Sequence, residues 1–373
     1  MRRTIYLVLI LSLLVTVVLG IPAANAGGPV QLSLEAAVIQ AWKVSDVLRL
    51  AQVTLDKSTE QREDAGEHAG SFIPAPGYNQ SPTADVAWVG LLKASANERI
   101  AKRDLENKWE SVAFDVYQKY FAVLSAEAGV AKAKAAVARD RFGLQTAWAV
   151  YQTGCGTRTQ YEAAQAKAEG AEKGLLAAQE SLDKAYVSFN RLVGLLPEDR
   201  PELIDEPVIS PLKVDSLEVE VEKAVNSSVD VFKLQMLKDM AEWDLNYPIA
   251  VDAYGNAVYR DYNVQEYEVD ISDINVASAR DALRERVRTT YHDIRALEQQ
   301  EAALAASVKT ASDALRIVQA QHKVGLVARD KVREAEAALA DVQASLESMK
   351  CQHASLLATW RYLTGHPVTS IKQ

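Results

Sequence analysis

Two stretches of the chain carry apolar residues in alternating steps of three and four, the spacing of one face of an α-helix. The two stretches are related by a constant offset, so that position n of the first corresponds to position n + 171 of the second. The first comprises Tyr161, Ala164, Ala168, Ala171, Leu175, Ala178, Leu182, Ala185, Phe189 and Leu192, and the second Val332, Ala335, Leu339, Val342, Leu346, Met349, His353, Leu356, Trp360 and Leu363. A pattern sustained over this length predicts a coiled-coil seam in each stretch.

A strict seven-residue stripe precedes the first seam. It consists of Trp109, Val116, Val123, Val130, Val137, Leu144 and Tyr151. The stripe predicts a helix from about residue 96 to residue 152, roughly 85 Å long at ~1.5 Å per residue. Helices of that length must pack lengthwise against one another.

The same offset relates glycines and aromatic residues outside the seams, so the chain is one unit used twice. The pairs are Gly154 with Gly325, Gly194 with Gly365, and Tyr120 with Tyr291. The two repeats also begin with matching segments, which differ in length by one residue: SLEAAVIQAWKVSDVLRL (33–50) and SLEVEVEKAVNSSVDVFKL (216–234). We therefore divide the chain into a first repeat (27–194), a proline-rich linker (195–215), a second repeat (216–366) and a C-terminal tail (367–373).

Each repeat also contains a stretch without helical spacing. The first, about 70–92, holds three prolines, and the second, about 247–272, alternates polar and apolar residues at Tyr267, Val269 and Ile271. Alternation of this kind is typical of a strand with one apolar face. We expect a short β-hairpin in each repeat, so the fold class is mainly α: long antiparallel coiled-coil hairpins in two tandem repeats, each with a β-hairpin insertion. The helical hairpins reverse at tips near 153–158 and 323–329.

Residues 1–26 read as a cleaved signal peptide. Arg2 and Arg3 precede an apolar run that ends near a small-residue site at Ala24-Asn25-Ala26. The alternative, a single membrane anchor, would need a longer apolar run. The arginine pair is compatible with two export routes, the twin-arginine route and ordinary Sec export. Either signal predicts export to the periplasm or outer membrane.

Composition excludes several classes of function. Loss of Arg2 and Arg3 with the signal peptide would take the formal charge from −9 to −11, which argues against a nucleic-acid partner. Two cysteines are too few for a disulfide framework, and no apolar run near twenty residues follows residue 26. The five histidines lack metal-ligand spacing, and no nucleophile elbow or phosphate loop is present. We expect neither an enzyme nor a bound cofactor or metal.

The order of these parts resembles the TolC-type outer membrane efflux proteins, also called outer membrane factors. The resemblance rests on LSLEAAVIQAW at the start of the first repeat, YQTGCGTRTQYEAAQAKAE and HKVGLVARDKVREAEAALA at the tips, and FNRLVGL and WRYLTGH at the ends of the repeats. It implies a homotrimer in which each protomer gives four strands to one β-barrel in the outer membrane. The long helices would continue as a periplasmic duct, which a periplasmic adaptor (membrane fusion) protein connects to an inner-membrane pump.

The resemblance also assigns roles to the tips. It implies that Thr153, Gly154 and Cys155 of the first tip, with Val324, Gly325 and Leu326 of the second, dock the adaptor. The family closes its duct nearby with acidic residues, but this chain carries Gln160 and Lys331 at two often acidic positions and keeps Glu334 at a third. With Arg158, Arg329 and Asp330 close by, we expect a mixed gate ring rather than an acidic one. An acidic duct would favour cationic or neutral solutes, unless the acidic residues lie on the solvated outer face.

Two further expectations concern the cysteines and the class of protein. Cys351 lies well beyond Gly325, roughly 39 Å along its helix, so Cys155 and Cys351 are too far apart for a disulfide within one protomer. Because the β insertions are short, a second reading stays open beside the export channel for small molecules or proteins. In that reading the chain is an exported coiled-coil scaffold, a reduced TolC-like protein without a complete membrane barrel.

Overall fold

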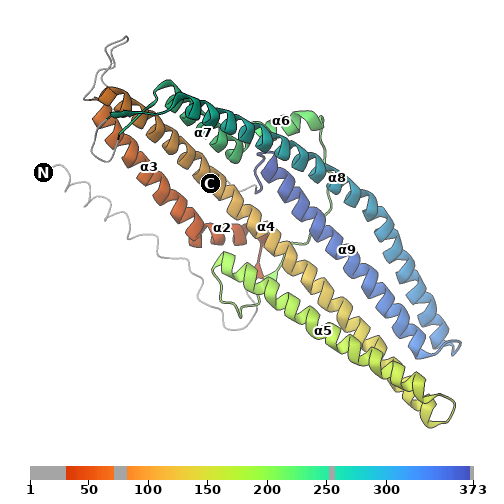
Figure 1. The fold of residues 1–373 in the computed structure, drawn as a ribbon. Coiled ribbons are helices and arrows are strands. Elements are labelled where there is room, and N and C mark those ends of the chain that lie inside the picture. The colour runs from red at the N-terminus through yellow and green to blue at the C-terminus, as the bar shows by residue number, and fades with distance from the viewer. Residues whose placement is uncertain (1–30, 71–81, 252–256, 370–373) are drawn as a thin grey trace, which may run out of the picture.

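The computed structural model describes residues 31–70, 82–251 and 257–369. The predicted signal peptide lies outside these residues. Within them the chain is dominated by long helices that run lengthwise beside one another (Figure 1). The fold class predicted from the apolar spacing, mainly α with long helical hairpins, is confirmed.

The first repeat contains α2 (Leu34–Val44), α3 (Asp46–Gly70), α4 (Pro82–Gln152) and α5 (Arg158–Val193), preceded by β1 (Gln31–Leu32). The linker contains β2 (Glu202–Leu203), which pairs in parallel with β1. The second repeat contains α6 (Leu217–Ser227), α7 (Val229–Asn246), β3 (Ile249–Val251), β4 (Ala257–Tyr259), α8 (Tyr262–Lys323) and α9 (Arg329–Leu363).

The helices reproduce the duplication residue by residue at the tips. Helices α4 and α8 end, and helices α5 and α9 begin, at positions that differ by the offset read from the sequence. The opening helices α2 and α6 both span 11 residues. Each is followed by a serine, Ser45 or Ser228, whose hydroxyl oxygen accepts a hydrogen bond from the first turn of the next helix.

Both predicted seams are buried. Every seam position from Tyr161 to Leu192 and from Val332 to Leu363 is buried or half-buried. The stripe on α4 is buried from Val116 to Val137 and becomes exposed at Tyr151, where the helix reaches its tip. The apolar spacing therefore identified the packed face of each long helix.

Two clusters of buried side chains form the core: one is built mainly from the first repeat but includes Cys351 and Ala358 of α9, and the other lies in the second repeat. Tyr120 and Phe189 are fully buried in the first, and Ile294 and Trp360 lie in the second. The Tyr120 hydroxyl donates to the Leu32 carbonyl (3.3 Å) and accepts from the Asp205 amide (2.9 Å), so it joins α4 to β1 and to the linker. Burial raises the pKa of Tyr120 to about 12, which keeps the hydroxyl protonated.

The β insertions differ from the prediction. In the second repeat β3 and β4 form an antiparallel hairpin, but each strand has three residues and the hairpin ends at Tyr259. Tyr267, Val269 and Ile271 lie in helix α8, because the Asp261 carboxylate caps the amides of residues 263 and 264 and starts a helix there. The strand assignment of these three residues was wrong.

The predicted first β-hairpin also extends too far toward the C-terminus. Pro82 opens α4, so residues 82–92 are helical rather than strand. Proline fits the first helical position because its missing N–H has no partner there and its φ is already helical. Residues 71–81, the rest of the predicted hairpin, lie outside the described residues. No helix in the described ranges is long and apolar enough to cross a membrane.

Candidate functional site at the hairpin tips

The two tips share one backbone conformation. Gly154 and Gly325 have φ values of 73° and 77°, in the left-handed region that favours glycine. The next amide in each tip reaches back five residues: Cys155 N–H donates to the Val150 carbonyl (3.1 Å) and Leu326 N–H to the Gln321 carbonyl (2.9 Å). This is the Schellman ending of a helix. The prediction that these glycines mark where the hairpins reverse is confirmed.

The side chains assigned to docking lie at the end of the molecule. Val324 and Leu326 are 70% and 75% exposed, and Cys155 is exposed with a free thiol. The Thr153 hydroxyl instead donates to the Val150 carbonyl (2.9 Å) and stabilises the turn. Two apolar side chains this exposed at one tip fit a contact surface, and their docking role stays a prediction.

The first tip projects beyond the second along the helix axis. The Gln118 amide donates to the Ser355 carbonyl, so the two residues lie at the same level of α4 and α9. From that level α4 continues to its end at Gln152, whereas α9 reaches back to its start at Arg329, and the first span is about eight residues longer. At ~1.5 Å per residue this difference corresponds to about 12 Å.

Two further contacts between α4 and α9 give the same register. The hydroxyl groups of Ser125 and Ser348 are in contact, and Lys132 pairs with Asp341. Both pairs lie on the same alignment of the two helices as Gln118 and Ser355. Figure 1 shows the α4–α5 tip extending past the α8–α9 tip.

An aromatic cluster distinguishes the first tip. The Trp148 and Tyr161 rings have centroids 5.1 Å apart, and Tyr151 stacks on Tyr161 at 5.9 Å. The Trp148 and Tyr151 side chains remain partly exposed. The corresponding residues of the second tip are Gln319, His322 and Val332. The prediction from sequence missed this cluster, although its spacing of three residues on one helix was visible.

The candidate gate residues are engaged mainly on their own helices. Arg158 pairs with Glu162 at 2.7 Å and Lys331 pairs with Glu334 at 2.9 Å. The hydrogen bond between them raises the pKa of Lys331 and lowers that of Glu334, so both are charged over the physiological range. The structure therefore brings together Lys331 and Glu334, the two members of the proposed mixed ring.

The remaining gate candidates have structural partners. The Arg329 guanidinium lies 6.0 Å from the Phe142 ring centroid on α4, and the Asp330 carboxylate accepts from the Lys331 amide. Gln160 forms a capping box with Thr157: each side chain accepts from the other residue's amide. This pairing satisfies two free amides at the start of α5. The unusual Gln160 is thereby explained by helix capping, and the sequence Thr157-Arg-Thr-Gln160 is the signature that could have revealed it.

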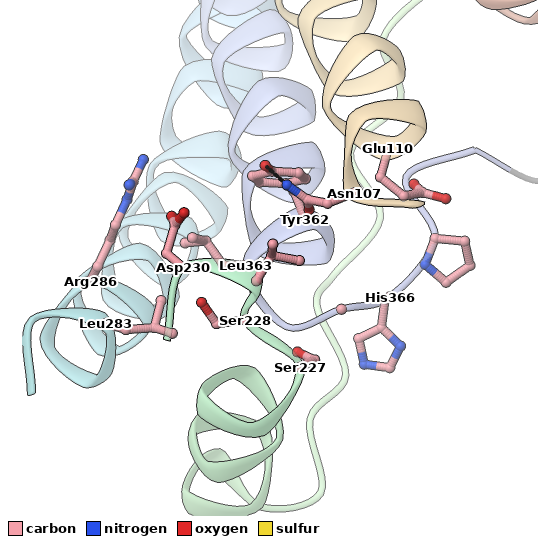
Figure 2. Close-up of a pocket in the computed structure, with 13 residues that line it drawn as sticks. Asn107, Glu110, Ser227, Ser228, Asp230, Leu283, Arg286, Tyr362, Leu363 and His366 are labelled. Atoms are coloured by element: carbon pink, nitrogen blue, oxygen red, sulfur yellow. Dashed lines mark hydrogen bonds between the residues drawn. The ribbon is translucent and has the colours of Figure 1, made fainter. Parts of the chain in front are cut away.

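A cavity of about 360 Å³ lies where the break between α6 and α7 meets the end of α9 (Figure 2). Asn107 on α4 donates to the Tyr362 hydroxyl (3.1 Å) across its wall, and Glu110 accepts from the Val368 amide (3.0 Å). The charged side chains that line it have both signs: Glu110 and Asp230 are acidic and Arg286 is basic. This mixture of acidic and basic side chains indicates no single class of ligand. We therefore regard the cavity as part of the joint between the two repeats.

The cysteines lie far apart and both are free. Cys351 lies well inside α9, which begins at Arg329, and the offset of the first tip adds about 12 Å to its distance from Cys155. Burial raises the pKa of the Cys351 thiol to about 12, which makes it unreactive. Across residues 31–70, 82–251 and 257–369, no group of three or more His, Cys, Asp or Glu side chains is placed to hold a metal ion.

Comparisons with known proteins place these features in context. Residues 241–366 match the sequence family described as outer membrane efflux protein. No curated protein sequence matches the chain.

Solved outer-membrane channels share the fold. The outer-membrane channel OprN superposes with a TM-score of 0.68 at 11% identity, covering 90% of each chain. The Campylobacter jejuni outer membrane channel CmeC gives 0.67 at 12% identity, covering 89% of this chain and 85% of its own. The Vibrio cholerae outer membrane protein VceC gives 0.64 at 16% identity, covering 90% and 97%. These findings confirm that the chain resembles the TolC-type outer membrane efflux proteins, in the sequence of residues 241–366 and in the fold of about 90% of its length.

Proposed function

We propose that this protein is the outer-membrane channel component of a tripartite efflux or type I secretion system. The observation that carries the proposal is the duplicated helical hairpin, with α4 about 107 Å long at ~1.5 Å per residue and both tips uncovered at one end. Helices of this length suit a conduit that bridges two membranes. The likeness to OprN, CmeC and VceC supports the same reading.

The functional unit in this proposal is a homotrimer in the outer membrane. One protomer forms an open wall, in which α4 packs on α5 and α9, and α9 packs on α8. A wall with two free edges needs further copies to close around a solute path. The chain carries no catalytic role in this scheme, since the proteins it matches are channels.

The tips are the proposed contact with a periplasmic adaptor and, through it, with an inner-membrane pump. Leu326→Asp should abolish adaptor binding, because it places a charge on an apolar side chain that is 75% exposed at the second tip. Leu176→Asp is the matched control, since Leu176 is similarly exposed but lies midway along α5. Equal loss of binding in the two variants would contradict docking at the tips.

Membrane fractionation and planar-bilayer conductance of the purified full-length protein test the channel itself. A channel should sediment with the outer membrane, require detergent for extraction and give discrete conductance steps. An exported coiled-coil scaffold, the second candidate, should leave with the soluble fraction and give none. The short strands β3 and β4 are the observation that keeps this second candidate in view.

A further inference from the structure

A histidine is buried in the seam between α8 and α9 without a hydrogen-bond partner. His353 is 0% exposed, and neither ring nitrogen bonds to another group of the described chain. Its Nε2 lies 3.7 Å from Glu298 Oε1, too far for a hydrogen bond. The first repeat carries Leu182 at the corresponding seam position, so packing alone does not require a polar side chain there. An unsatisfied buried imidazole is costly and calls for a role.

The neighbouring carboxylate holds the linker. Glu298 Oε1 accepts the Leu212 amide (2.6 Å), and Oε2 pairs with Arg295 at 2.7 Å. The Glu298 side chain is itself only 10% exposed. Leu212 belongs to the linker that joins the two repeats, and it packs against the second core cluster. One carboxylate therefore stands between His353 and the linker backbone.

The first repeat places a tyrosine hydroxyl, not an imidazole, beside its equivalent glutamate. Glu127 occupies the position equivalent to Glu298 and accepts from the Tyr186 hydroxyl at 2.6 Å. The Tyr186 hydroxyl also lies 3.4 Å from the Pro201 carbonyl of the linker. Burial raises the pKa of Tyr186, and its bond to Glu127 adds to the effect, so this half stays unchanged over the physiological range. Only the second half places an imidazole, the side chain whose ordinary pKa lies closest to neutral pH, beside its glutamate.

The charged groups around His353 leave Glu298 as its acceptor. They are Glu298 and Arg295 on α8, the Lys350–Glu347 pair one turn away on α9, and Glu127 on α4, which acts on the adjacent Cys351. Lys350 and Glu347 neutralise each other at 2.8 Å, and Arg295 engages the far oxygen of Glu298. The near oxygen, Oε1, accepts the Leu212 amide.

We propose that His353 and Glu298 form a proton-dependent latch on the linker. In the neutral state Glu298 Oε1 holds the Leu212 amide and His353 stays unbonded. When His353 takes a proton from solvent, its Nε2–H closes the gap to Glu298 and draws the carboxylate toward the ring, because a hydrogen bond between two ionised groups is stronger than one from a neutral amide to the same carboxylate. The Leu212 amide then loses its acceptor and the linker loosens from the second repeat. The latch does not depend on the protein's being a channel.

Hydrogen exchange of the full-length protein tests the latch at about pH 5.5 and 7.5, one unit on either side of the ordinary histidine pKa. With labelling times scaled for chemical exchange, peptides that cover Leu212 should lose about tenfold in protection at the lower pH. Peptides that cover Asp205, whose amide bonds to the Tyr120 hydroxyl, should not change. Asp205 is thus a control within the same linker.

Two variants separate the latch from general acid loosening. His353→Leu restores the residue of the first repeat and should keep Leu212 protected at both pH values. Glu298→Gln retains an acceptor for Leu212 but removes the charge that attracts the imidazolium, so it should also abolish the pH dependence. An unchanged Leu212 protection in the wild type would overturn the proposal. So would the same tenfold loss in either variant.

Discussion

Replacing Gly365 with alanine should destabilise the protein more than the same change at Gly325. Both glycines have left-handed φ values, 67° and 77°, so alanine at either site costs about 1–2 kcal/mol of backbone strain. The two sites differ in the room that each leaves for a Cβ atom. A Cβ at Gly325 meets nothing within 4 Å, whereas a Cβ at Gly365 would lie 2.6 Å from Ser227 Oγ and 2.8 Å from Ser227 Cβ.

The steric contact sets the size of the difference. Forcing a methyl group into a packed site costs about 1–3 kcal/mol, which adds to the strain at Gly365 only. We expect a loss of about 2–5 kcal/mol for Gly365→Ala against about 1–2 kcal/mol for Gly325→Ala. With an unfolding entropy of roughly 2.1 cal/mol/K per residue, each kcal/mol shifts the Tm of a chain of 373 residues by about 1.3 °C. The two variants should therefore differ by about 1.3–4 °C.

Thermal unfolding followed by circular dichroism measures these shifts in the purified full-length protein. Gly170→Ala is a control, because this glycine lies inside α5 with open space around it and alanine should stabilise the helix by up to about 1 kcal/mol. Adding Ser227→Gly to Gly365→Ala removes both clashing atoms and should recover most of the extra loss. Equal Tm shifts for Gly365→Ala and Gly325→Ala would refute the close approach of α9 to α6.

Three further predictions concern the tips. Thr157→Ala should lower the free energy of unfolding by about 1 kcal/mol in urea titrations, because it breaks the capping box, whereas Ala328→Ser should raise it by adding the missing cap to α9. In the folded protein a maleimide should label Cys155 alone, with Cys351 reacting only in denaturant. If the Cys155 thiols lie near the axis of a closed trimer, mild oxidation should crosslink them between protomers, and a ladder of monomers only would count against that position. Lys331→Asp should increase cation preference in single-channel recordings if Lys331 faces the pore, and unchanged selectivity would remove it from the gate.

The sequence predicted the helical frame well because the signals for it are local. A left-handed glycine ends a helix wherever it stands, so Gly154 and Gly325 located both tips to within a residue. The apolar spacing identified the buried face of each helix. The strand prediction at Tyr267 and Ile271 failed for a local reason too: a few alternating residues on an exposed helix surface look like a strand, and the Asp261 cap was overlooked.

The site was less predictable because it depends on contacts between hairpins. The exposure of Val324 and Leu326 followed from their position at a turn. The offset between the tips, however, arises from the register between α4 and α9, which is set by pairs such as Gln118 with Ser355 that lie far apart in the sequence. No spacing within one helix records that register. The seam pattern placed His353 on the buried face, but its position beside Glu298 required the structure.

The duplication explains why the tips share a backbone but not a surface. The four left-handed glycines are the positions where any other residue would strain the chain, so both copies need them. No such demand acts on the solvent-facing side chains, and there the copies differ: Trp148 and Tyr151 in the first tip, Val324 and Leu326 in the second. Because the first tip also projects about 12 Å further, a partner that contacts both must present a stepped surface with two different pockets. Loss of either pair should therefore weaken binding independently, and exchanging the two tip sequences should impair binding even though both backbones are preserved.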